Sequence, residues 1–259
     1  MIENSFIFLS GIGEKTETRL WKRGITSWSQ YTDLPDKEVP KRVRRHRKVH
    51  ARHLGLAREA LAEEDLSPFA RWLPSSEAWR AFEAAGDRVL YLDIETTGLA
   101  YPEGRTTVVG GHMPATGTQL LVKDQDLSAR SVQAMLDEAS LLVTFNGKQF
   151  DIPFLQKEFD VTADHLPHLD LRFALKKVGI TGGLKKIEHK LGIAREDEVA
   201  GMDGYEAVLL WKRWERGEEA ALDKLLAYNR EDVVNMEPLA RIAYDKLRQE
   251  TFEACCQIA

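Results

Sequence analysis

Cysteine is almost missing from this chain of 259 residues, which contains only Cys255 and Cys256. Adjacent cysteines rarely pair with each other, and two cysteines complete neither a disulfide framework nor a zinc site. We therefore expect a protein of the reducing cytoplasm, with this pair at a frayed or partly packed helix end.

Long hydrophobic runs are also absent, since no apolar stretch reaches the ~18 residues that a membrane-spanning helix needs. The stretch 1–9 is short and has no basic residue, so it does not match a secretory signal peptide. The hydrophobic content of 43% instead predicts a globular protein with an ordinary core and no membrane partner.

Acidic side chains are missing from 41–58, although the net charge of the whole chain is −5. Lysine and arginine crowd this segment. A basic segment beside an acidic body favours contact with phosphates, and a solvated helix face is the alternative. The cations that we expect to contact a nucleic-acid backbone are Arg44, Arg45, Arg47 and Lys48.

The most informative stretch is an apolar run over 89–92 that leads into two acids, Asp93 and Glu95. The run predicts a buried strand, and residues i and i+2 of a strand share a face. Two carboxylates on one face repel each other, and a divalent cation with oxygen ligands removes that conflict. We interpret the pair as half of a metal site, with a strand-end turn as the alternative.

Two later segments supply matching groups. A second strand-like run over 141–145 leads into Asn146 and Asp151. Near the C-terminus, Tyr228 and Asp232 are four residues apart and share one face of a predicted helix. Asp151 also suits a helix cap, while Tyr228 and Asp232 also suit a core aromatic and a solvated acid.

These three motifs, in this order and on these elements, resemble the DEDD superfamily of 3′–5′ exonucleases on a ribonuclease-H-like fold. The tyrosine four residues before the last acid resembles the DEDDy branch, and the nearest subgroup is similar to the predicted exonucleases of the YprB type. The resemblance covers roughly residues 89–247.

The resemblance implies a two-metal site. It implies that two divalent ions, Mg²⁺ or Mn²⁺, are bound by four catalytic carboxylates, namely Asp93, Glu95, Asp151 and Asp232. In that scheme Asp93 bridges both ions, and Tyr228 orients the attacking water. It also implies that the 3′-terminal nucleotide is held by the turn Thr96, Thr97, Gly98 and Leu99, and that Asn146 lines the groove.

Two further residues keep open roles. Lys185 follows a glycine pair and is a candidate to hold phosphates of the scissile strand, or else belongs to a solvated helix start. Asp170 either caps or orients the helix after it, or hydrogen-bonds to a metal ligand.

The N-terminal region has a glycine motif of its own, with Gly11 and Gly13 before a predicted helix that ends at Gly24. The motif is similar to the hairpin of a helix-hairpin-helix element. There, Gly11, Gly13 and Lys15 would contact a phosphate at the helix start, and a tight turn in a small helical domain is the alternative.

The expected fold class is α/β, a ribonuclease-H-like mixed five-stranded sheet flanked by helices, preceded by a small all-α domain. Strands are expected over 89–95, 106–113, 119–123, 141–145 and 167–171. Helices are expected over 128–139, 152–159, 173–178, 184–191, 205–216 and 218–247. We place a helical, nucleic-acid-binding region at 1–65, a packed connector at 66–86 and the exonuclease domain at 87–259.

The expected function is metal-dependent 3′–5′ exonuclease action on single-stranded nucleic acid, with DNA slightly favoured over RNA. The 3′–5′ polarity comes from the resemblance alone. The alternatives are an endonuclease or structure-specific nuclease on the same fold, and a non-catalytic nucleic-acid-binding module with a relic site.

Overall fold

The computed structural model describes residues 1–98, 100–196, 198–199 and 201–256. Leu99, which the sequence analysis assigned to the grip on the terminal nucleotide, lies outside the described residues.

A mixed five-stranded sheet forms the centre of the molecule, as the sequence predicts. Its strands are β1 (Val89–Thr96), β2 (Thr106–Met113), β3 (Gly117–Val122), β4 (Leu141–Thr144) and β5 (His168–Asp170). The order is β3-β2-β1-β4-β5. β1 pairs antiparallel with β2 and parallel with β4, because a tight connection returns the chain antiparallel whereas an intervening helix allows a parallel return.

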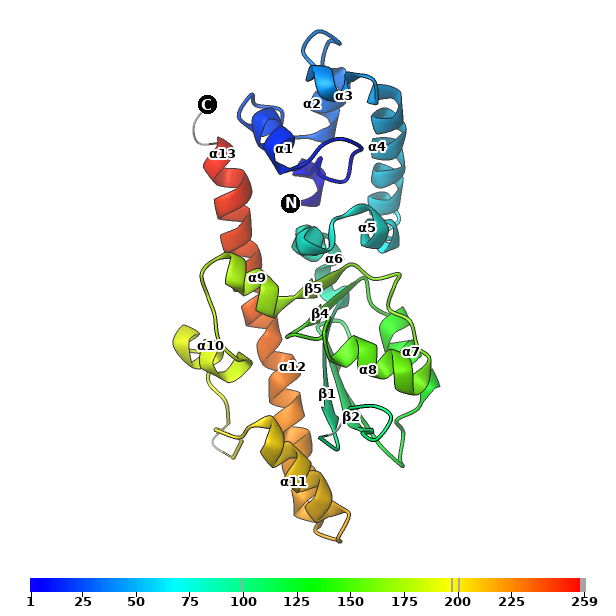
Figure 1. The fold of residues 1–259 in the computed structure, drawn as a ribbon, viewed down its shortest axis with the longest axis vertical. Helices are drawn as coiled ribbons and strands as arrows, with labels where there is room; N and C mark the ends of the chain where they lie inside the picture. Colours follow the sequence, from blue (N-terminus) through cyan, green and yellow to red (C-terminus); the bar gives the residue numbers. More distant parts are fainter. Residues whose placement is uncertain (99, 197, 200, 257–259) are drawn as a thin grey trace.

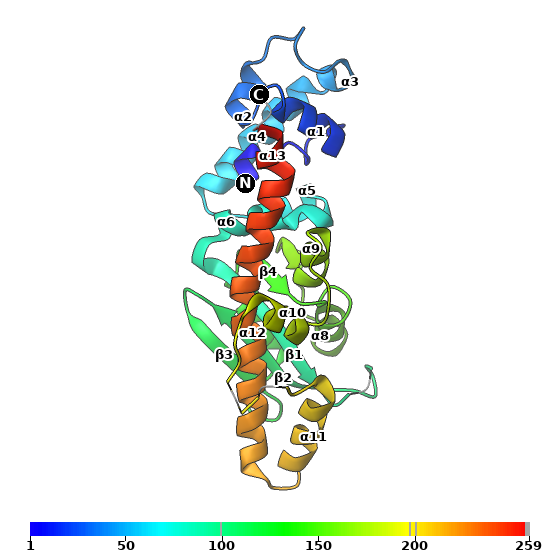
Figure 2. The ribbon, with the colours of Figure 1, turned by 90° about the vertical axis from the view of Figure 1, so that its left-hand side faces the viewer.

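The helices of this part follow the predicted order. They are α7 (Ala129–Asp137), α8 (Asp151–Phe159), α9 (Leu171–Lys177), α10 (Leu184–Leu191), α11 (Gly204–Trp214) and α12 (Glu219–Arg248), continued by η4 (Gln249–Glu253) and α13 (Ala254–Cys256). The predicted cap at Ser128 is confirmed, since its side chain accepts a hydrogen bond from Ser131 N. With 30 residues, α12 is about 45 Å long and runs along much of the molecule (Figure 2).

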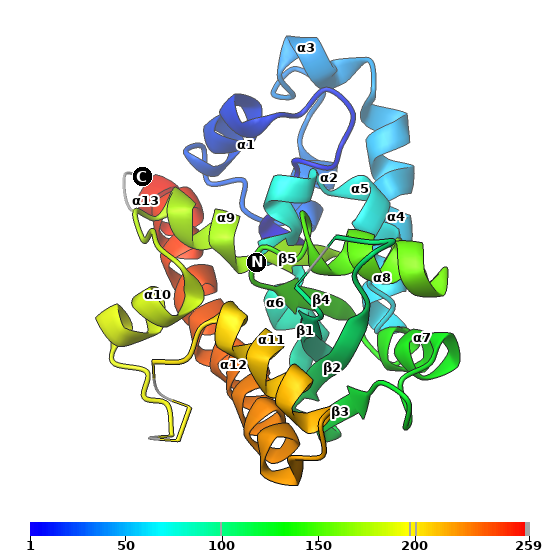
Figure 3. The same ribbon diagram turned by 60° about the horizontal axis from the view of Figure 1, so that its bottom comes forward.

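The sheet lies between two helical layers, with α7 and α8 on one face and α12 on the other (Figures 1 and 3). Alternation along β1 explains this, because Leu90 and Leu92 pack with α7 and α8 while Val89 and Tyr91 pack with α12. Asp93 continues the second set, so the acid pair faces α12.

The N-terminal helices gather at one end of the molecule, beside α13 (Figure 1). They are η1 (Ile2–Asn4), α1 (Glu14–Trp21), α2 (Trp28–Asp33), α3 (Lys41–Arg44) and α4 (Arg47–Ala62). The segment after them forms α5 (Ser67–Trp72), η2 (Ser75–Ala81), α6 (Phe82–Ala85) and η3 (Gly86–Arg88). Trp21, Trp79 and Tyr244 belong to one apolar cluster that extends into the sheet, so the core is continuous between these parts.

A buried ionic network adds to that contact. Arg80 is buried and lies 2.9 Å from Glu17 of α1 and 2.8 Å from Glu77 of η2. Glu77 in turn pairs with Lys177 of α9 at 2.9 Å. Because each carboxylate has a cationic partner, the network ties α1 and η2 to the sheet body without an unpaired buried charge.

No helix among the described residues is both long enough and apolar enough to cross a bilayer.

Candidate active site

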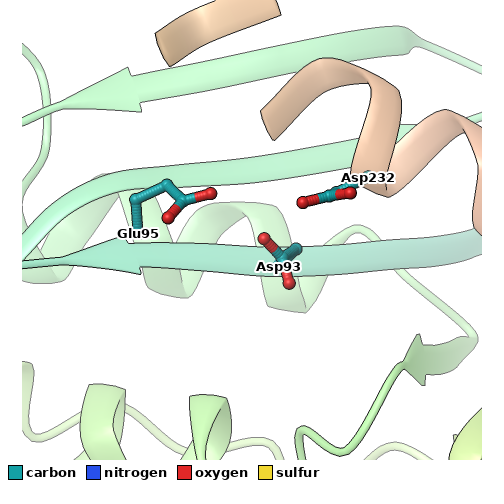
Figure 4. A group of neighbouring side chains, drawn as sticks. All are labelled: Asp93, Glu95 and Asp232. Carbon is teal, nitrogen blue, oxygen red and sulfur yellow. The ribbon is translucent and has the colours of Figure 1, made fainter. Parts of the chain in front are cut away.

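Three carboxylates converge between β1 and α12, as Figure 4 shows. Asp93 and Glu95 come from β1 and Asp232 comes from α12, and one ligand oxygen from each lies within 4.8 Å of the others. Glu95 is 8% exposed and Asp232 is 5% exposed. The fold thus gathers three of the four predicted carboxylates, although Asp232 follows Glu95 by 137 positions in sequence.

A glycine on β2 lets α12 approach the acid pair. Gly110 stands opposite Asp93 in the β1–β2 ladder. A Cβ atom at Gly110 would overlap Asn229 Oδ1 and lie 3.0 Å from Asn229 Cγ. Asn229 is fully buried, and its Nδ2 donates a hydrogen bond of 3.0 Å to Asp93 Oδ2. Asn229 therefore orients the carboxylate of Asp93, a role that the sequence analysis missed.

Asp151 borders this cluster without belonging to it. It is the first residue of α8, and its Oδ1 accepts a hydrogen bond from Ile94 N at 3.2 Å. The expected helix start at Ile152 is one residue late. Asp151 is not a side-chain cap, because Phe150 holds the N-cap position of α8. Its carboxylate instead joins the start of α8 to the central strand beside Asp93.

Crowding of carboxylates dominates the electrostatics of the site. Burial raises the pKa of Asp93 well above its ordinary value, and Asp151, Asp232 and Glu95 raise it further. Burial also raises the pKa of Glu95, again with a contribution from Asp232. Burial is likewise the main cause that raises the pKa of Asp151, to about 7. An all-oxygen donor set under this repulsion fits a hard divalent cation such as Mg²⁺ or Mn²⁺.

Two basic side chains approach the cluster from the segment around α10. The guanidinium of Arg195 donates to Asp232 Oδ1 and also makes hydrogen bonds of 2.7 and 2.8 Å with the buried carboxylate of Glu188. Lys185 Nζ donates to the Tyr228 hydroxyl at 2.6 Å. The contact of Arg195 with the site was not predicted from the sequence, because a single arginine before acidic residues matches no motif.

The cleft at the cluster has a volume of about 310 Å³. Tyr228 lines it together with Asp232, as their shared helix face predicted. Burial raises the pKa of the Tyr228 phenol, and Asp232 and Glu95 raise it further. The phenol therefore stays protonated at neutral pH and can orient a hydrogen-bonded group, but it is a poor general base.

The remaining residues of the predicted substrate grip divide into two sets. Thr96, Gly98 and Asn146 line the cleft. Thr97 instead pairs with Arg105 through backbone and side chain, since Thr97 N donates to Arg105 O at 2.9 Å. The structure thus brings Thr96 and Gly98, but not Thr97, to the wall of the cleft.

Asp170 holds the turn after β4 and also caps the helix that follows it, the first of the two roles predicted for it. Its carboxylate accepts hydrogen bonds from the backbone N–H groups of Asn146, Lys148 and Arg172 at 2.9, 3.1 and 3.1 Å. Arg172 Nη1 also donates to Asn146 Oδ1 at 2.6 Å. Asp170 therefore caps α9 and at the same time fixes the turn that carries Asn146 into the cleft.

The predicted backbone-binding cations lie on α3, α4 and the joint between them, at the end of the molecule away from α11 (Figure 1). Arg45 and Lys48 are exposed. Arg44 instead donates to carbonyl oxygens of the preceding loop, and Arg47 pairs with Asp36 at 3.3 Å. Exposed cations and structural cations thus alternate along this basic segment.

The glycine motif lies at the start of α1, where Gly13 is the N-cap and Gly11 has a positive φ of 78°. Gly24 also has a positive φ, of 75°, and follows α1 as predicted. The element before the motif is η1, a 3₁₀ helix of three residues. A phosphate contact by Gly11, Gly13 and Lys15 stays a prediction.

A mixed sheet in this strand order, with acids on its central strand and on the helix that covers it, defines the ribonuclease-H-like class of α/β proteins. The chain belongs to the RNase_H superfamily, whose RNase_H_2 family model matches residues 90–244. Members of this superfamily are typically nucleases.

Two known proteins are similar to the chain. YprB of Bacillus subtilis (strain 168), described as an uncharacterized protein, is 29% identical over 172 residues. That match covers 58% of this chain and 40% of YprB, so the chain spans less than half of that relative. The family B DNA polymerase of the hyperthermophilic archaeon Pyrobaculum calidifontis shares the fold, with a TM-score of 0.52 and 16% identity over 66% of this chain and 26% of the polymerase.

Proposed function

We propose that this chain is a metal-dependent nuclease that removes nucleotides from the 3′ end of single-stranded nucleic acid, with DNA slightly favoured. The observation that carries the proposal is the carboxylate cluster of Asp93, Glu95 and Asp232, with the Tyr228 hydroxyl in the same cleft. Such a cluster is unfavourable without a cation, so it has a chemical purpose rather than a stabilising one.

The residues of the chain have separable roles in this proposal. Asp93, Glu95 and Asp232 hold divalent cations, and Asp151 completes the second side of the site. Two such cations, when bound, supply a nucleophilic water and stabilise the departing 3′-oxygen. Asn229 keeps Asp93 oriented, and Tyr228 orients the attacking water through its protonated hydroxyl.

The shape of the cleft supports attack at a strand end. A volume of about 310 Å³ is at the small end of ligand sites and suits one terminal nucleotide. Gly98 and Val208 wall one part of the cleft, and Phe150, which is exposed, borders another. Space for one nucleotide is what a strand end needs, and this volume is the reason that we propose an exonuclease rather than an endonuclease.

Affinity for the rest of the strand would come from the basic segment. Arg45 and Lys48 on the N-terminal helices are exposed and can contact phosphates without reading sequence. Gly11, Gly13 and Lys15 at the start of α1 would add backbone and ammonium donors.

A cleavage assay tests the proposal. The purified chain is incubated with Mg²⁺ or Mn²⁺ and single-stranded DNA and RNA, each labelled at one end and offered with free or blocked 3′ termini. We expect stepwise shortening from free 3′ ends, abolished by EDTA. Asp93→Asn should lower the rate by more than about 100-fold, because it removes a metal ligand rather than its support.

The matched control is Asp223→Asn, an exposed carboxylate on the same helix as Asp232. It should retain the wild-type rate. Cleavage of circular single strands would point to the endonuclease alternative. Strand binding without any metal-dependent cleavage would point to the non-catalytic alternative and end the proposal.

A further inference from the structure

A second and larger cleft lies beside the candidate active site. Its volume is about 640 Å³, roughly twice that of the carboxylate cleft, and it is walled by α9 and η2. Its apolar lining includes Trp79, Leu169 and Ala174. Both the size and the apolar lining are those of a ligand-binding site.

The rim of this second cleft combines an aromatic ring with cations. Phe173, Lys176 and Lys177 stand at positions i, i+3 and i+4 of α9, so they share one helix face. Phe173 is 42% exposed, so its ring is accessible to a ligand. An aromatic ring beside lysines is a combination that suits a base and its phosphate.

The lysines of the cleft retain donors for a ligand. Lys148 Nζ donates to Ser75 O and Ser75 Oγ, and Lys177 Nζ donates to Ser76 O and Glu77 Oε1. Each ammonium has three donors, so one N–H remains on each after these contacts.

The charges around the second cleft leave a positive balance. Asp170 already accepts three backbone N–H groups. Its charge persists and offsets one of the three lysines of the lining, and Glu77 offsets Lys177 by pairing with it at 2.9 Å. Lys176 supplies the remaining positive charge, which favours a negatively charged ligand.

The two clefts share a wall. Asn146 lines the carboxylate cleft and Lys148 lines the second cleft, and both backbone N–H groups bind the same Asp170 carboxylate. Two residues span at most about 7 Å of chain, so the clefts lie within a few nucleotides of each other. A strand whose end occupies the first cleft can reach the second.

We infer that the second cleft binds a nucleotide upstream of the terminal one, with its base against Phe173 and its phosphate near Lys176. The inference rests on the proposed function, which assigns the 3′ end to the carboxylate cleft. Stacking on an aromatic ring accepts any base, so the cleft would lengthen the contact with the strand without selecting its sequence.

Substrate length is the variable that tests this inference. For Phe173→Ala in the full chain, we expect about 5- to 150-fold weaker binding of a single-stranded octanucleotide, the range of one lost stacking contact. The kcat/KM for a mononucleotide p-nitrophenyl ester should stay at the wild-type value, because such a substrate has no upstream nucleotide. Phe173→Trp should restore octanucleotide affinity.

Lys176→Gln should weaken octanucleotide binding and lower its salt slope by about 0.7, the value of one phosphate contact in a single strand. Lys212→Gln, an exposed lysine on α11, is the charge-matched control and should change neither quantity. Octanucleotide affinity within about twofold of wild type in both Phe173→Ala and Lys176→Gln would overturn the inference.

Binding is measured by fluorescence anisotropy with a labelled octanucleotide in EDTA, so the result does not depend on cleavage. If the chain cleaves nothing but Phe173→Ala still weakens binding, the proposed function fails and the strand-binding cleft stands. If cleavage proceeds and Phe173→Ala binds normally, the inference alone fails.

Discussion

Gly110→Ala isolates the contact that orients Asp93. The new methyl group would overlap Asn229 Oδ1, and Asn229 is the residue whose amide donates to Asp93. Because Asn229 is fully buried, it has no open space to move into. The substitution should therefore push the amide off the carboxylate while leaving all metal ligands in the sequence.

The size of the effect follows from two contributions. Overpacking a well-filled core costs about 1–3 kcal/mol, and loss of a hydrogen bond to a charged group adds about 1.5–3 kcal/mol. For a chain of this length the sum corresponds to a fall in Tm of roughly 5–15 °C. Mn²⁺ affinity should weaken about 10- to 100-fold, the usual effect of losing a group that supports a metal ligand.

Gly111→Ala is the matched control on the adjacent position of β2. Its methyl group would point to the opposite face, against the flexible side chain of Met135 and 3.1 Å from Leu90 Cδ1. It should lower Tm by a few degrees and leave Mn²⁺ affinity unchanged. Thermal melts and calorimetric Mn²⁺ titrations measure both variants. Equal Mn²⁺ affinities for Gly110→Ala and Gly111→Ala would refute the role of the Asn229 contact.

Three further predictions follow from charges in and around the site. In EDTA, Tm should fall as the pH rises from 5 to 8, because burial raises the pKa of Asp151 to about 7. The folded chain then holds a proton that the unfolded chain releases near pH 4. Saturating Mn²⁺ should flatten this profile, and a rising profile in EDTA would contradict the reasoning. Arg195→Ala should lower the free energy of unfolding by about 3–5 kcal/mol in urea titrations, because it strands the buried carboxylate of Glu188. The double variant Arg195→Ala/Glu188→Gln should recover part of the lost free energy of unfolding. Purely additive effects of the two substitutions would contradict a coupling between Arg195 and Glu188. Lys48→Glu should reduce the salt slope of oligonucleotide binding without changing Tm, whereas Arg47→Met should lower Tm, since Arg47 donates to a carbonyl of α2. A lower Tm in Lys48→Glu together with an unchanged Tm in Arg47→Met would contradict this division into exposed and structural cations.

Local sequence patterns were sufficient for most of the fold. The apolar run 89–92 and the alternation after it predicted β1, and Ser128 predicted the start of α7. Both signals act over a few residues, because strand period and helix caps are properties of the local backbone. The metal-site interpretation of the acid pair at the end of β1 has the same local basis. Two carboxylates on one face of a strand repel each other, whatever the position of that strand in the fold.

Contacts between segments far apart in the chain could not be predicted from local patterns. Asn229 looks like any polar residue on a helix until Gly110, more than a hundred positions earlier, brings it over Asp93. Arg195 has no motif around it, and its meaning comes from Asp232 on another element. The difference between Arg47 and its exposed neighbours likewise depends on how α4 packs against α2.

The sequence by itself determined the order of the strands and helices, the face on which Asp93 and Glu95 lie, and the helix face shared by Tyr228 and Asp232. These follow from periodicity, which each segment carries alone. Only the tertiary structure decided which carboxylates meet, which groups hold them and that a second cleft opens beside them at Phe173. Those outcomes depend on the close packing of elements far apart in the chain, which no local pattern encodes.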